Sequence, residues 1–208
     1  ADMPTCSPAT RAWCLYEWDH TVFLHGLDGL HLVGLTSEDR GRIVQEICIE
    51  TAECFDPADL VMIHARVKEH HGSLAQFNAA LKLQLLLNPL SYKVDREQLA
   101  RRSEGTAWEF GQVQALLADA SQPRALCILA GAGTGKSTIS AALLEGVLGA
   151  AVGQSGPATA FHFLKHSDAR RLDPVRIVKS LAFQLALQLP ELREALFSLD
   201  GQAVDKLS

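Results

Sequence analysis

The sequence lacks the features of several protein classes. Its apolar runs stay far below the roughly 18 consecutive residues of a membrane-spanning helix, so we expect no membrane partner. Basic residues are not in excess, since 19 Lys and Arg stand against 24 Asp and Glu and the formal net charge is −5. Tight basic pairs occur only at residues 101–102 and 170–171. Because a nucleic-acid surface needs clustered positive charge, we expect no nucleic-acid partner.

Cysteine is scarce and irregularly placed. The chain has five cysteines, an odd number, and no Cys-x-x-Cys motif, so neither a disulfide framework nor a zinc site is expected. The first 20 residues carry scattered charges and no apolar core, which does not fit a secretory signal peptide. These features favour the cytoplasm and ordinary core positions for the thiols. The cysteines are Cys6, Cys14, Cys48, Cys54 and Cys127.

Both ends of the chain resemble cuts through a longer protein. The sequence starts with Ala1 in place of Met and passes quickly into an aromatic and apolar stretch at residues 13–18. It stops shortly after a helical pattern at residues 191–199. We therefore expect a fragment or a truncated reading frame.

Helix-capping signals predict helices in the first half. A Ser, Thr or Asp stands before each predicted helix, and a Gly or an Asn-Pro pair ends the second and the third. Residues 91–106 are polar, and we expect a linker or a solvated helix there. The predicted helices of this half are 37–49, 57–71 and 74–87.

Three apolar segments are predicted to be strands. They are LHLVGL (30–35), ALCILA (125–130) and GPATAFHFLKH (156–166). Helical patterns precede, separate and follow the last two, at 108–120, 137–149 and 174–189. Alternating strands and helices predict a parallel sheet with right-handed crossovers. The expected fold class is α/β, with a partial P-loop NTPase sheet after a partial, mostly helical α/β module.

The run LAGAGTGKST (129–138) lies between the second predicted strand and the next helix. That order, and a Gly-x-x-x-x-Gly-Lys-Ser pattern with Ala130 in the first position, are those of a phosphate-binding loop. Lys136 is placed to reach the β- and γ-phosphates as the catalytic residue, and Ser137 to ligate Mg²⁺. The predicted nucleotide-binding residues are Ala130, Gly131, Ala132, Gly133, Thr134, Gly135, Lys136, Ser137 and Thr138.

The histidines do not suggest a metal site. His162 and His166 would lie about 13 Å apart on a strand, too far for one ion, and no third ligand is obvious. His70 and His71 fall at the C-terminus of a predicted helix, where a cation suits the helix dipole. We expect structural roles for all four.

The loop and the residues after it resemble a known family. AGAGTGKSTISAALL, followed by FHFLKHSDARRLDPVRIVKSLAFQLA, looks like the NACHT-type NTPase domain of STAND signalling proteins, in particular the nephrocystin-like N-terminal NTPase subgroup. The resemblance covers about residues 104–200, including the Trp-Glu-Phe helix at 108–110. It implies ATP, or less readily GTP, with Mg²⁺ as ligands, and protein partners bound through absent repeat domains. Its matches after the loop are Asp168, Asp173, Pro174, Leu181, Ala182, Gln184 and Leu185.

The N-terminal half carries a weaker resemblance. ATRAWCLYEWDHT and ECFDPADLVMIHARVKEHHGSLAQFNAAL look like a module found beside repeat or NACHT domains in algal and protist proteins, with a TIR-like or flavodoxin-like fold. Trp13, Cys14 and Glu17 are candidate site residues of this module, although packing is the preferred interpretation of all three. The expected domains are residues 1–90, a linker at 91–106, and an NTPase segment at 107–208.

Hydrolysis in P-loop proteins also needs an apolar strand that ends in Asp and holds Mg²⁺. LFSLD (196–200) comes nearest, but Ser198 interrupts it and it continues a helical pattern. The family resemblance therefore implies a chain cut before this Walker B strand, which would hydrolyse nucleotide poorly.

Three functions follow from the sequence. The first is a nucleotide-dependent switch in a signalling NTPase. The second is a metabolic P-loop kinase, whose lid arginines would be Arg170, Arg171 and Arg176. The third is a non-catalytic fragment that binds another protein. The intact Lys136–Ser137 pair favours the first.

Overall fold

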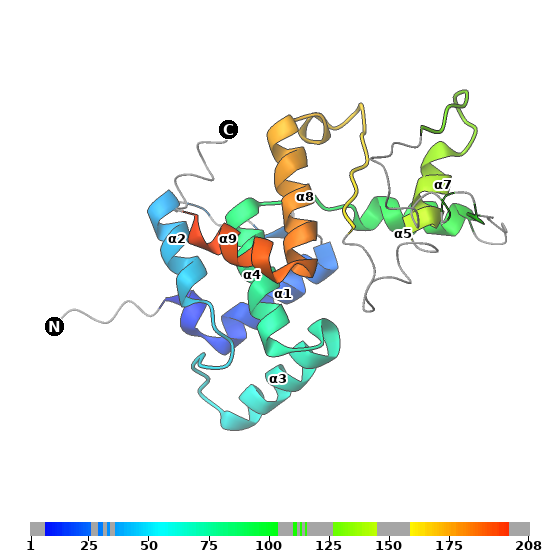
Figure 1. Cartoon of the computed structure of the whole chain (residues 1–208). Helices are drawn as coiled ribbons and strands as arrows, with labels where there is room; N and C mark the ends of the chain where they lie inside the picture. Colours follow the sequence, from blue (N-terminus) through cyan, green and yellow to red (C-terminus); the bar gives the residue numbers. More distant parts are fainter. Residues whose placement is uncertain are drawn as a thin grey trace. The chain divides into compact units, whose positions relative to one another are not determined.

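The computed structural model describes residues 7–25, 29–30, 33, 36–103, 110–111, 113, 115, 127–144 and 159–199. The chain divides into two compact units. The larger unit joins residues 1–91 to 160–208, and the smaller unit is residues 92–159. Helices dominate the described residues of both units (Figure 1).

The larger unit contains six α-helices and two short 3-10 helices among its described residues. The α-helices are α1 (Ala12–His25), α2 (Ser37–Glu46), α3 (Pro57–His71), α4 (Leu74–Leu87), α8 (Pro174–Gln188) and α9 (Pro190–Ser198). The 3-10 helices are η1 (Pro8–Thr10) and η5 (Ala169–Arg171).

Side-chain caps explain where most of these helices begin. Thr36 and Asp39 form a reciprocal capping box at α2, and Asp56 accepts a hydrogen bond from the backbone N–H of Ala58 at α3. Ser73 and Asp173 cap α4 and α8 in the same way. Each cap satisfies a backbone donor that lacks a partner within its helix. The predicted helices at 57–71 and 74–87 are confirmed with these caps, and the helix predicted at 174–189 begins as expected and ends at Gln188.

The main hydrophobic core lies between α1, α3, α4 and the segment after α2. Phe77 of α4 is fully buried there, together with Leu15 and Ile63. The N-terminal residues are tied to the same region, because the N–H of Ala12 donates to the carbonyl of Glu53 (3.0 Å) and the N–H of Glu53 donates to the carbonyl of Thr10 (2.7 Å). This contact is an isolated bridge and does not extend into a sheet.

A second apolar cluster joins the C-terminal end of α4 to α8 and α9. Leu83, Leu86 and Leu87 are buried against Ala186 of α8. Beside them, the N–H of Leu90 donates to the buried hydroxyl oxygen of Ser180 at 2.8 Å. Residues on either side of the phosphate loop in sequence therefore share one core, and Figure 1 shows α8 and α9 beside α4. The apolar end predicted for the helix at 74–87 is confirmed as buried.

The smaller unit pairs α5 (Lys93–Ser103) with α7 (Lys136–Leu143), the helix that follows the phosphate loop. No residue of α5 is buried, as the polar composition of 91–106 suggests. Of α7, Ala141 is buried. The helix predicted at 108–120 lies mostly outside the described residues, with Gly111, Val113 and Ala115 in helical conformation.

The predicted α/β fold class is wrong for the described part of the chain, which contains no strand and no parallel sheet. Ile128 and Leu129 of the predicted strand at 125–130 are 47% and 87% exposed, whereas a central parallel strand is covered on both faces. Val33, from the segment 30–35, is 90% exposed. The described part of 156–166 is extended but does not pair with another strand.

Phe161 shows why the segment predicted as a strand at 156–166 does not join a sheet. Its N–H donates to the side-chain oxygen of Gln184 at 3.0 Å, and the Gln184 amide donates back to the Phe161 carbonyl at 2.9 Å. A glutamine of α8 thus takes both backbone groups that a neighbouring strand would have used. The segment is held against a helix and not within a sheet.

Candidate functional site

The phosphate-binding loop predicted at 130–138 is an exposed turn followed by a helix. Gly133 and Gly135 have φ angles of 76° and 86°, in the region that residues with a Cβ rarely adopt. Between them, the Thr134 hydroxyl donates to the Gly131 carbonyl at 2.9 Å and closes the turn. The glycine spacing of the motif therefore provides two left-handed backbone positions within three residues.

Lys136 folds back over this turn. Its Nζ donates to the carbonyl oxygens of Ala130 at 2.8 Å and Gly131 at 2.6 Å, while the side chain stays exposed. The sequence pattern predicts that this ammonium is near the loop but does not predict these two acceptors. They hold the charge on the loop, where an anion would be contacted.

The N-terminus of α7 has no side-chain cap. Its N-cap residue is Gly135, whereas α2, α3, α4 and α8 each have a side chain that accepts a backbone hydrogen bond. The backbone N–H groups of the first turn of α7 therefore face solvent without that protection. Such a helix terminus favours an anion both by hydrogen bonding and by its dipole.

The hydroxyl of Ser137 is exposed and has no hydrogen-bond partner among the described residues. Ala132 is exposed as well, and Thr138 is half-buried on α7. The structure brings the predicted loop residues together in one continuous exposed segment. An ammonium, a hydroxyl and an uncapped helix terminus meet there, which is a suitable set of groups for a phosphate and its counter-ion.

The motif residues after the loop have structural roles in the larger unit. Asp168 accepts hydrogen bonds from the side chain of Arg170 at 3.0 Å, and these bonds lower the pKa of the Asp168 carboxyl. Asp173 caps α8, and Gln184 holds Phe161. Three of the residues that carry the family resemblance thus stabilise the extended segment and the helix that follow the loop.

The arginines of the kinase interpretation are engaged in the same way. Arg170 pairs with Asp168, Arg176 lies 3.9 Å from Asp173, and Arg171 is buried. Arg171 contacts Asp168 at 3.5 Å and donates to the Ser91 carbonyl at 3.3 Å. These contacts hold the fold together and do not present three side chains to an acceptor.

The candidate residues of the N-terminal half do not converge on a site. Trp13 donates to the carboxylate of Asp59 at 3.1 Å, Cys14 is half-buried and Glu17 is exposed. His71 contacts the carboxylate of Asp19 at 3.0 Å, and His162 contacts the Arg171 carbonyl at 2.9 Å. Within the described residues, no group of three His, Cys, Asp or Glu side chains is arranged to hold a metal ion.

Sequence reasoning missed one further group of residues. Asn88 and Lys179 line a pocket where α4 ends and α8 begins. The only signals were an Asn-Pro pair after a helix and two cations three residues apart at 176 and 179. Such patterns are common at helix ends, so the pocket becomes visible only when α4 and α8 are packed together.

The exposed loop and the helix after it define a candidate phosphate-binding segment. Comparison with protein families gives one match within this region: residues 107–206, slightly less than half of the chain, match the model described as Nephrocystin 3, N-terminal. Comparisons with curated proteins and with solved structures give no match. None of the helices in the described residues combines the length and the apolar character of a membrane-spanning segment.

Proposed function

We propose that residues 130–138 bind the phosphates of a nucleoside triphosphate, ATP in preference to GTP, together with Mg²⁺. The observation that carries this proposal is the position of Lys136, whose ammonium lies on the Ala130 and Gly131 carbonyls beside two left-handed glycines. Phosphate oxygens are charged acceptors, and hydrogen bonds to them are stronger than those to neutral carbonyls. Lys136 would therefore form stronger hydrogen bonds by exchanging the two carbonyl oxygens for phosphate oxygens.

Each other group has a defined part in binding. The uncapped N–H groups of α7 would donate to phosphate oxygens, and the exposed Ser137 hydroxyl would ligate Mg²⁺. The ion would neutralise charge on the β- and γ-phosphates. Residues 130–134 are exposed, so a ligand would displace no packed side chain there.

We further propose that nucleotide binding acts as a switch in a NACHT- or STAND-like signalling protein, with other proteins as partners. The match of residues 107–206 to the nephrocystin 3 N-terminal model supports this assignment over a metabolic kinase. The engaged Arg170, Arg171 and Arg176 support it as well, because a kinase lid needs arginines that reach the acceptor.

Nucleotide binding is tested by titrating the full chain with a fluorescent ATP analogue and Mg²⁺. Lys136→Ala should abolish saturable binding, whereas Lys68→Ala, at an exposed position on α3, should leave it unchanged. Competition with ATP and GTP then ranks the two nucleotides. A folded wild-type chain that does not bind, or equal binding by the two variants, would contradict the proposal.

The switch is tested separately by limited proteolysis with Mg·ATP, with Mg·ADP and without nucleotide. A ligand shifts a conformational equilibrium only when it binds the two states differently. Different cleavage patterns with ATP and ADP are expected. Identical patterns at saturating nucleotide would leave the binding site in place but remove the switch.

A further inference from the structure

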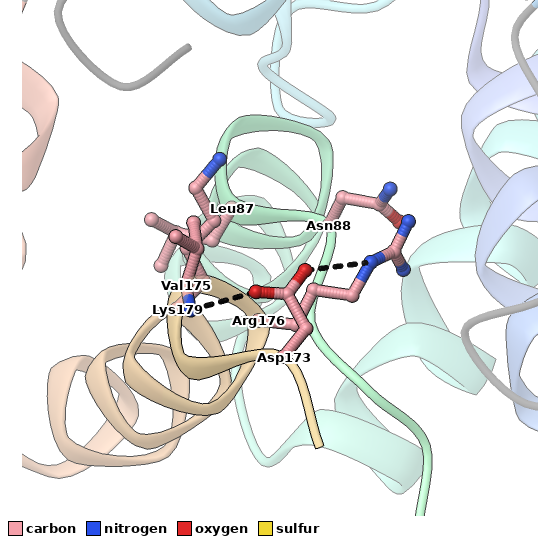
Figure 2. Close-up of a pocket in the computed structure, with 6 residues that line it drawn as sticks. All are labelled: Leu87, Asn88, Asp173, Val175, Arg176 and Lys179. Atoms are coloured by element: carbon pink, nitrogen blue, oxygen red, sulfur yellow. Dashed lines mark hydrogen bonds and ion pairs between the residues drawn. The ribbon is translucent and has the colours of Figure 1, made fainter. Parts of the chain in front are cut away.

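The larger unit contains a pocket of about 300 Å³ that the nucleotide proposal does not use. It lies where the C-terminal end of α4 meets the first turns of α8, and Figure 2 shows its residues. Its volume is at the lower end of the range for small-molecule sites. Its lining consists of Leu87, Asn88, Asp173, Val175, Arg176 and Lys179.

The walls of this pocket are held in place by hydrogen bonds. Asn88 ends α4 in the left-handed conformation, with a φ of 45°, and its N–H donates to the Gln84 carbonyl at 2.9 Å. Two residues later, the Leu90 N–H donates to Ser180, which in turn donates to the Arg176 carbonyl at 2.7 Å. The turn after α4 is thereby fastened to α8, and the pocket is formed before any ligand arrives.

The charges in the pocket are not balanced internally. Asp173 accepts a hydrogen bond from the N–H of Val175 at 2.9 Å and lies 3.9 Å from Arg176 Nε, and both contacts are drawn in Figure 2. Lys179 has no hydrogen-bond or ion-pair partner among the described residues. The lining therefore carries one negative and two positive charges, and Lys179 is the cation left for a ligand.

From this arrangement we infer that the pocket binds a carboxylate attached to a short apolar group. Lys179 pairs with the carboxylate, and Leu87 and Val175 contact the apolar part. A single negative charge matches the one excess positive charge. A phosphate dianion is disfavoured, because its second charge would lie near Asp173. The inference does not depend on nucleotide binding by the loop.

Two kinds of ligand could supply this carboxylate: a free small acid, or an acidic side chain of another protein. The probes are therefore 3-methylbutanoate and a peptide blocked at both ends that contains one Glu beside a Leu. Inorganic phosphate serves as the probe for the rejected dianion. Binding to the full chain is followed by NMR chemical-shift titration.

The diagnostic variant is Lys179→Gln, and Lys68→Gln is the matched control with the same charge change on an exposed part of α3. A hydrogen bond to a charged group typically contributes enough that its loss weakens binding about tenfold or more. We expect that loss for Lys179→Gln with whichever carboxylate binds, and no change for Lys68→Gln.

Several results would overturn the inference. One is that neither carboxylate saturates the wild-type chain, and another is that inorganic phosphate binds more tightly than both. A third is that Lys179→Gln lowers the melting temperature without changing binding. In that case the positive charge of Lys179 stabilises the C-terminal end of α4 by interacting with the helix dipole. The position of Lys179 would then be explained without a ligand. If Lys179→Gln does not fold, Lys179→Arg, which keeps the charge, must retain binding.

Discussion

Different interactions stabilise the larger unit and the phosphate loop. In the larger unit, apolar side chains are buried at helix contacts, and side-chain caps close α2, α3, α4 and α8. In the described residues 127–137, nearly every side chain is exposed, and the turn is closed by hydrogen bonds from Thr134 and Lys136 to loop carbonyls. Burial stabilises the first region, and local backbone geometry defines the second.

The family match runs across both regions. Residues 107–206 include the loop in the smaller unit and α8 with α9 in the larger one. The loop proposed to bind phosphate and the residues that pack α8 therefore follow each other along one matched segment. Substitutions in the two parts should differ in kind: one set should change stability and the other should change affinity.

The largest effect is expected in the core of the larger unit. Phe77→Ala removes a fully buried ring and should lower the free energy of unfolding by about 3–5 kcal/mol. Leu129→Ala, at an exposed apolar side chain beside the loop, should change it by less than about 0.5 kcal/mol. Urea unfolding followed by far-UV circular dichroism measures both. Equal losses would mean that residues 127–130 are packed in solution.

The next effect concerns two serines that make similar hydrogen bonds at different burial. Ser180→Ala leaves the buried N–H of Leu90 without its acceptor and should cost about 1–3 kcal/mol. Ser140→Ala removes a bond that the Ser140 hydroxyl donates to the Lys136 carbonyl at an exposed position, as Ser180 donates to the Arg176 carbonyl. Water replaces that bond, so we expect a change below about 0.5 kcal/mol. A Ser180→Ala variant as stable as the wild type would show that the turn after α4 is not fastened to α8.

A smaller effect, on affinity, is expected in the loop. Gly135→Ala places a Cβ at a φ of 86°, which costs about 1–2 kcal/mol in that conformation. Gly41→Ala, at a glycine of α2, is the control, because a Cβ there would meet no atom within 4 Å. The fluorescent ATP analogue should bind Gly135→Ala about tenfold more weakly than the wild type and should bind Gly41→Ala as well as the wild type. The reverse order would remove the geometric argument for the loop.

Helices with their own capping signals were predictable from the sequence, and segments fixed by distant residues were not. The bounds of α3 follow from residues at its own ends, namely Asp56, Pro57 and Gly72. No helix was predicted at 12–25, where α1 forms, because its first N–H is satisfied by Glu53, far along the chain. The same holds for Phe161, whose backbone is taken by Gln184. Short apolar runs such as ALCILA do not distinguish a strand from other structures without such information.

The candidate site was predicted in part. The glycine and lysine spacing indicates the loop, because the positive φ angles at Gly133 and Gly135 are a local property of those residues. The carbonyl partners of Lys136 and the pocket at Asn88 depend on how the folded chain brings these residues close to one another. Neither has a signature in the sequence beyond common residue types.

The smallest expected effect is on the pH dependence of stability. Hydrogen bonds from the Arg170 side chain lower the pKa of Asp168 below its ordinary value of 3.8, and the nearby charges of Arg170 and Arg171 act in the same direction, against partial burial. A carboxyl whose pKa is lower in the folded state stabilises that state above its unfolded pKa. This contribution is lost as the pH falls through the lowered value.

Thermal melts of Asp168→Asn should therefore depend less on pH below about 4 than those of the wild type. Glu194→Gln, at an exposed residue of α9, should keep the wild-type slope. A slope unchanged in Asp168→Asn would show that the Asp168–Arg170 contact is not maintained in solution, and the extended segment after the loop would then be held by Gln184 and not by this pair.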